Sequence, residues 1–90
     1  MKLIRTERFK REFRKLPEHI RKQAIRKLKL LVMDPRHPSL RVKKIRGEVR
    51  GYRDVFEGGG SITKDYRFLF RVEEGSYILL TCGSHDEFFK

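Results

Sequence analysis

Apolar residues recur at helical spacing along the first third of the chain. The first run, with steps of four and three residues, consists of Phe9, Phe13 and Leu16. A second run with similar steps consists of Ile20, Ala24, Leu28 and Leu31. Because three- and four-residue steps place side chains on one face of a helix, the pattern predicts two amphipathic helices. Thr6 is a suitable N-cap for the first helix, and Pro17 ends it and opens the second.

The last third of the chain alternates between apolar and polar residues, which is typical of a strand with one buried face. In residues 65–72 the apolar face comprises Tyr66, Phe68, Phe70 and Val72. The opposite face comprises Asp65, Arg67, Leu69 and Arg71. Residues 76–82 form a second strand, joined to the first by a turn at residues 73–75. The two runs therefore predict a β-hairpin.

Shorter runs complete the predicted architecture. Further strands are expected at residues 2–5, 40–46 and 53–57. The three consecutive glycines at 58–60 favour a mobile loop or a wide turn over a regular element. A strand, two helices and then three or four antiparallel strands define an α+β fold in which a helical hairpin packs on one face of the sheet. Ninety residues accommodate one domain, which we expect to span residues 1–90.

The chain carries a formal net charge of +11, and this charge is unevenly distributed. Residues 1–53 contain 19 of the 23 Lys and Arg residues but 5 of the 12 acidic residues. A field of one sign attracts phosphate-bearing or acidic partners and accelerates encounter with them. Charge-rich surfaces also accompany thermostability, yet such surfaces usually mix both signs. The composition therefore favours a polyanionic partner over a merely well-solvated surface.

The single cysteine, Cys82, excludes an internal disulfide framework and is typical of a protein in a reducing cytosol. It lies in an apolar run, where a buried small side chain is expected. Charges recur too closely near the amino terminus for the apolar run of a signal peptide. No apolar run approaches the roughly 20 residues of a membrane span. We therefore expect a cytoplasmic protein without a membrane segment.

Three chemically suitable side chains converge in the predicted hairpin. Asp65 and Arg67 lie near the start of one strand, and His85 follows the end of the other. An imidazole can donate and accept protons near neutral pH, and a guanidinium can hold a phosphate. The other histidines, His19 and His37, lie on a helix among cations and in a proline-bounded loop. Because the histidines and the cysteine show no metal-ligand spacing, no metal and no cofactor are expected.

Four segments together resemble the RelE/ParE superfamily of bacterial and archaeal toxins, with the nearest likeness to RelE-like and YafQ-like messenger-RNA interferases. The segments are residues 40–47, 51–54, 65–67 and 83–89. The aspartate-aromatic-arginine strand and the glycine-hydroxyl-histidine ending are the most specific of them. The resemblance implies a small, twisted antiparallel sheet with an N-terminal helical hairpin packed on one face.

The resemblance also implies an activity. The expected protein is the toxin of a type II toxin–antitoxin system, a metal-independent endoribonuclease that cuts messenger RNA in the ribosomal decoding site. Attack of a ribose 2′-hydroxyl on the adjacent phosphate leaves a 2′,3′-cyclic phosphate and a 5′-hydroxyl. The expected protein partner is an acidic, partly disordered antitoxin.

The same resemblance implies roles for individual residues. His85 is the expected general acid or base, Asp65 orients it or shares in the proton transfer, and Arg67 stabilises the extra negative charge of the transition state. The residues expected to contact RNA are Lys43, Lys44, Arg46, Arg53, Arg71 and Phe89.

Two departures from the family pattern keep other functions open. Lys43 and Phe56 stand where YafQ-like enzymes carry further histidines. Phe88 and Phe89 stand where RelE-like enzymes often end in a catalytic tyrosine. One alternative is a non-enzymatic, ParE-like poison of DNA gyrase, although that role does not require His85. The other is a catalytically degenerate RNA- or ribosome-binding module.

Overall fold

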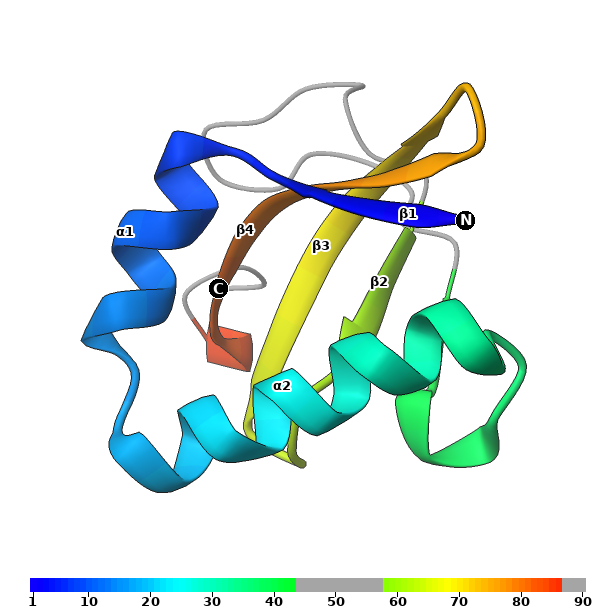
Figure 1. Cartoon of the computed structure of the whole chain (residues 1–90). Helices are drawn as coiled ribbons and strands as arrows, with labels where there is room; N and C mark the ends of the chain where they lie inside the picture. Colours follow the sequence, from blue (N-terminus) through cyan, green and yellow to red (C-terminus); the bar gives the residue numbers. More distant parts are fainter. Residues whose placement is uncertain (44–57, 87–90) are drawn as a thin grey trace.

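The computed structural model describes residues 1–43 and 58–86 of the chain (Figure 1). The elements, in chain order, are β1 (Lys2–Arg5), α1 (Glu7–Lys15), α2 (Glu18–Met33), the 3₁₀-helix η1 (Pro38–Leu40), β2 (Gly58–Ser61), β3 (Tyr66–Glu73) and β4 (Ser76–Ser84). These strands form one sheet in the order β1-β4-β3-β2. Helices α1 and α2 pack on this sheet, which confirms the predicted α+β class.

The sheet is mixed and not wholly antiparallel. β3 is antiparallel to β4, as predicted, and also to β2, but β1 runs parallel to β4, with Leu3 opposite Tyr77. Because β1 and β4 are joined through most of the chain, no tight turn forces them into opposite directions. Thr6 turns the chain from β1 into α1: its Oγ1 donates to Leu79 O (2.8 Å) and accepts from Phe9 N–H (3.2 Å). The prediction of an antiparallel sheet was therefore wrong for β1.

Both helices lie where the apolar spacing predicts them. The C-cap of α1 is Leu16, whose N–H donates to Phe13 O at 3.1 Å. Pro17 is the N-cap of α2, and its carbonyl accepts from the N–H groups of Ile20 and Arg21, both at 2.9 Å. The proline thus separates the two helices, as predicted. Within the described residues, no helix is long and apolar enough to cross a membrane.

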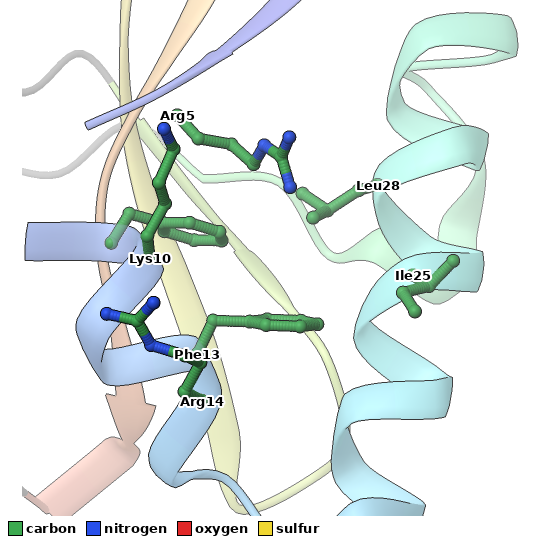
Figure 2. Close-up of a pocket in the computed structure, with 7 residues that line it drawn as sticks. Arg5, Lys10, Phe13, Arg14, Ile25 and Leu28 are labelled. Carbon is green, nitrogen blue, oxygen red and sulfur yellow. The ribbon is translucent and has the colours of Figure 1, made fainter. Parts of the chain in front are cut away.

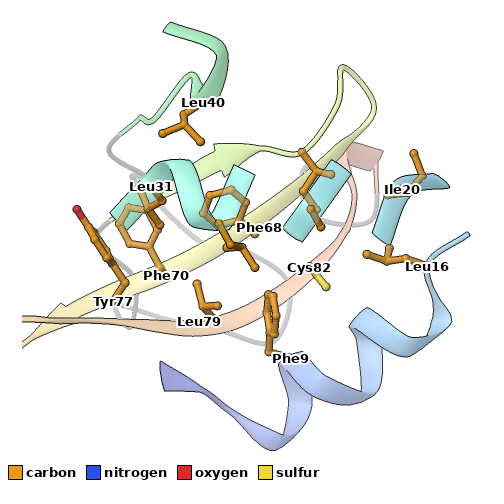
Figure 3. Close-up of a cluster of buried hydrophobic side chains, with 13 residues drawn as sticks. Phe9, Leu16, Ile20, Leu31, Leu40, Phe68, Phe70, Tyr77, Leu79 and Cys82 are labelled. Atoms are coloured by element: carbon orange, nitrogen blue, oxygen red, sulfur yellow. The ribbon is translucent and has the colours of Figure 1, made fainter. Parts of the chain in front are cut away.

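The core lies between the helices and the sheet (Figure 3). The apolar stripes of both helices enter it, together with alternating residues of β3 and β4. Its buried members are Phe9, Leu16, Ile20, Ala24, Leu28, Leu31, Leu40, Ile62, Phe68, Phe70, Tyr77, Leu79 and Cys82. Phe68 and Phe70 confirm the predicted apolar face of β3, and Tyr66 and Val72 pack against the cluster. Cys82 is a buried free cysteine, as expected.

Residues 58–60 belong to strand β2, so the prediction of a loop was wrong. Two aromatic rings of β3 explain why glycines stand here. A Cβ on Gly60 would lie 2.5 Å from Phe68 Cζ, and a Cβ on Gly58 would lie 3.0 Å from Phe70 Cζ. The rings therefore occupy the space that side chains of β2 would take. Close packing, and not backbone freedom, requires glycine at these two positions.

The strand predicted at residues 40–46 is not formed in its described part. Leu40 ends η1 and is fully buried, and Arg41 adopts a left-handed backbone conformation with a φ of 47°. A residue in that conformation cannot continue an extended strand, which explains the difference. Lys43 then forms an isolated antiparallel bridge to Gly59, with both N–H···O distances at 3.0 Å. Outside the described residues lie the rest of this segment and the strand predicted at 53–57.

The β3–β4 hairpin determines which residues meet at its open end. Glu74 and Gly75 form the turn, with φ angles of 46° and 74°. Two consecutive positive φ angles belong to the two-residue turn whose twist matches that of the flanking strands. At the other end of the hairpin, Tyr66 pairs with Ser84. The start of β3 therefore meets the end of β4.

Candidate active site

Asp65 and His85 lie side by side at the open end of the hairpin. Just beyond the last β3–β4 pair, the N–H of His85 donates to Asp65 O at 2.7 Å. Asp65 N–H in turn donates to Thr63 Oγ1 at 3.3 Å, within the turn that leads into β3. Both Asp65 and His85 are exposed. The structure thus brings the backbones of the predicted acid and histidine together at the surface.

Arg67 lies within the sheet, one strand position beyond Tyr66, and its exposed fraction is 9%. It pairs with Ser61 of β2 on one side and with Gly83 of β4 on the other. Its Nη1 donates to Ser61 Oγ at 3.4 Å, and its Nε has no partner among the described residues. Because burial makes an unsatisfied donor costly, an anion that reaches this guanidinium gains a favourable hydrogen bond.

The surroundings of Arg67 disfavour its positive charge. Burial lowers the pKa of its guanidinium below the ordinary arginine value, and the positive charge of Arg41 lowers this pKa further. Arginine nevertheless stays protonated in proteins. An anion beside Arg67 offsets both effects, because it supplies a counter-charge to a cation that lacks water and faces another cation.

The other residues predicted to contact RNA differ in their exposure and in whether they form an ion pair. Arg71 is half-buried, and its Nη2 forms an ion pair with Glu73 Oε2 at 2.9 Å. Lys43 is exposed beside Gly59, beyond β2 in the sheet order. The ion pairs formed between described residues do not include Lys43. The predicted contacts that lie outside the described residues are Lys44, Arg46, Arg53 and Phe89.

Two residues of the site, Ser61 and Arg41, were not expected from the sequence. Ser61 follows the three glycines that were assigned to a loop, so its pairing with Arg67 was not anticipated. The alternation of Phe68 and Phe70 is the signal that could have placed the glycines opposite β3. Arg41 offered no such signal, because residue type alone does not predict a left-handed arginine.

A second surface feature is the groove between α1 and α2, which Figure 2 shows and which has a volume of about 350 Å³. Its apolar lining consists of Phe9, Phe13, Ile25 and Leu28. Its cationic lining consists of Arg5, Lys10 and Arg14. We call this feature the helical groove. An apolar surface bordered by cations matches an amphipathic, acidic segment of a protein partner.

Several solved structures resemble this chain, whereas no family model and no curated protein matches its sequence. The YoeB/ParE toxin from Agrobacterium tumefaciens has a TM-score of 0.70 at 17% identity, over 94% of this chain and 99% of that chain. A chain of the RelB–RelE antitoxin–toxin complex from Methanococcus jannaschii has a TM-score of 0.68 at 18% identity, over 92% and 91%. YafQ from E. coli has a TM-score of 0.62 at 11% identity, over 93% and 92%.

The chain therefore has the fold of the RelE/ParE-like toxins, and the resemblance inferred from its sequence motifs is confirmed at the level of the fold. Two features carry this likeness: the helical hairpin packed on the sheet, and the near-complete coverage of both chains. At identities of 11–18%, the architecture is what these proteins share.

Proposed function

We propose that this chain is a cytoplasmic toxin of a type II toxin–antitoxin pair and that it cleaves messenger RNA on the ribosome without a metal. The observation that supports the proposal most strongly is the meeting of Asp65 and His85 near the buried Arg67. The fold shared with toxins gives this arrangement its context. The net charge of +11 agrees with a polyanionic substrate.

In the proposed reaction, a ribose 2′-hydroxyl attacks the adjacent phosphate and the 5′-oxygen of the next nucleotide leaves. The products are a 2′,3′-cyclic phosphate and a 5′-hydroxyl, so one proton leaves the nucleophile and one reaches the leaving group. His85 transfers one of these protons, and Asp65 orients its imidazole. Arg67 stabilises the charge that grows on the phosphate oxygens, because a buried, fixed cation needs little reorganisation during the reaction.

The test is cell-free translation of a defined message, with cut sites mapped by primer extension. We expect wild-type protein to cut within ribosome-bound codons and His85→Ala to leave the message intact. His19→Ala is the matched control, since His19 is also an exposed histidine, on α2, and has no expected role in the reaction. An intact message with wild-type protein overturns the proposal. Inhibition of plasmid supercoiling by gyrase would then support the ParE-like alternative.

We assign the helical groove to the antitoxin, because its cationic lining is complementary to an acidic partner. The assignment predicts that Lys10→Glu and Arg14→Glu weaken antitoxin binding about tenfold or more, since like charges across an interface cost several kcal/mol. Lys29→Glu on the exposed part of α2 is the control. Calorimetric titration with the acidic product of the neighbouring gene measures the effect. Equal losses for all three variants would show that net charge, and not the groove, governs binding.

A further inference from the structure

A cleft of about 330 Å³ lies between α2, η1 and the turn that joins β2 to β3. Its lining residues are Lys27, Ser39, Arg41, Ser61, Ile62, Thr63 and Lys64. The set contains three cations and three hydroxyl groups, and no carboxylate. The predicted catalytic residues are not part of this lining, but Thr63 Oγ1 accepts from Asp65 N–H, so the cleft adjoins the hairpin end where Asp65 and His85 meet.

Backbone geometry places the three cations around the cleft. Arg41 is the C-cap of η1, and its left-handed conformation is accompanied by an N–H bond to Pro38 O at 3.2 Å. The side chain of Lys27 extends from α2 to η1, and its Nζ donates to Ser39 O at 2.8 Å. Lys64 is exposed in the turn between β2 and β3. Three separate segments thus contribute one positive charge each to one small volume.

Ser61 joins the cleft to the candidate active site. It lines the cleft, and its Oγ accepts the hydrogen bond from Arg67 Nη1 at 3.4 Å. The charge of Arg41 reaches the same guanidinium, since it lowers the pKa of Arg67. The ion pairs between described residues include neither Arg67 nor any of the three cations of the cleft. Within the described part of the chain, these four cations therefore have no carboxylate partner at ion-pair distance.

We propose that this cleft is a second phosphate subsite, which holds the RNA backbone phosphate adjacent to the one bound beside Arg67. The inference rests on the proposed function and identifies how the substrate strand continues beyond the scissile bond. A strand bound at Arg67 necessarily presents a neighbouring phosphate, and ammonium, guanidinium and hydroxyl donors are the groups that contact phosphates in nucleic-acid complexes. The shared Ser61 connects the two positions.

The test uses the variant Arg41→Gly/Lys64→Gln. Both residues are exposed, and glycine adopts the left-handed conformation of residue 41 without strain, so the fold is preserved. The control is Arg26→Gln/Lys29→Gln, which removes the same two charges from exposed positions of α2 outside the cleft. The probe is a short, fluorescent 2′-O-methyl RNA, because a blocked 2′-hydroxyl prevents cleavage. Its dissociation constant is measured by anisotropy at several salt concentrations.

We expect the slope of log affinity against log salt to fall by about 0.7 for the cleft variant, which corresponds to one lost contact to a single-strand phosphate. The control variant should keep the wild-type slope. Wild-type slopes in both variants, with histidine-dependent cleavage of message intact, would overturn the subsite and leave the proposed function standing. A reduced slope for the cleft variant, with wild-type protein that cuts no message, would retain the subsite and overturn the nuclease.

A second measurement distinguishes RNA from an acidic protein as the occupant. Amide chemical shifts of Ser61, Thr63 and Lys64 are followed while the 2′-O-methyl RNA or the antitoxin is added. Shifts at these amides with RNA support the subsite. If the cleft variant weakens antitoxin binding and leaves RNA binding unchanged, the cleft belongs to the protein interface and the proposal is wrong.

Discussion

Replacing Gly60 by alanine tests whether close packing explains the glycines of β2. The new Cβ would lie 2.5 Å from Phe68 Cζ and 2.8 Å from its Cε1, with Leu40 O at 3.3 Å on another side. Phe68 and Leu40 are both fully buried, so neither can move away into solvent. The added methyl group therefore has to displace part of the core.

Two effects of opposite sign decide the magnitude. Alanine in place of glycine stabilises by about 0.4–1 kcal/mol when the native backbone accepts it, because the unfolded chain loses freedom. An extra methyl group in a packed core costs about 1–3 kcal/mol. Because the contact falls well inside van der Waals distance, we expect packing to prevail, with a net loss of about 1–2 kcal/mol. Gly58→Ala, whose Cβ would lie 3.0 Å from Phe70 Cζ, should lose less.

Urea unfolding followed by far-ultraviolet circular dichroism measures these changes, provided that the slope with denaturant stays constant. The double variant Gly60→Ala/Phe68→Leu is the critical control, because leucine lacks the ring atoms that meet the new Cβ. We expect its loss in the free energy of unfolding to be smaller than the sum of the losses of the two single variants, by at least about 0.5 kcal/mol. Additive effects, or a Gly60→Ala variant as stable as wild type, would refute the packing argument.

Three further outcomes are expected. Thr6→Ala should lower the free energy of unfolding by about 1 kcal/mol, because it removes the cap of α1 and the hydrogen bond to Leu79 O. Thr6→Ser keeps the hydroxyl group and should retain most of this stabilisation in the same urea assay. Arg67→Ala should reduce message cleavage far more than RNA affinity, because the negative charge that Arg67 stabilises on the phosphate grows in the transition state. Equal losses in both would assign Arg67 to binding. Lys43→Ala should weaken RNA binding and lower its salt slope by about 0.7, and an unchanged slope would remove Lys43 from the phosphate contacts.

Much of the candidate site could be predicted from the alternation of side chains along the strands of one hairpin. Asp65 and Arg67 fall on one side of β3 by the two-residue period, and a short turn at residues 74–75 leads the chain back so that His85 meets Asp65. Such contacts are local, so a sequence pattern can predict them. The burial of Arg67 and the proximity of Arg41 were not predictable in this way, because they depend on which distant segments pack around the hairpin.

By itself, the sequence determined the two helices, the apolar face of β3, the hairpin and the α+β class, because each rests on a short-range period or a local cap. Only the tertiary structure decided that β1 runs parallel to β4, and that three glycines form a strand beneath two aromatic rings. The tertiary structure also decided that three cations from separate segments surround one cleft. These features are set by contacts between residues far apart in the chain, and such contacts leave no periodic trace in the sequence.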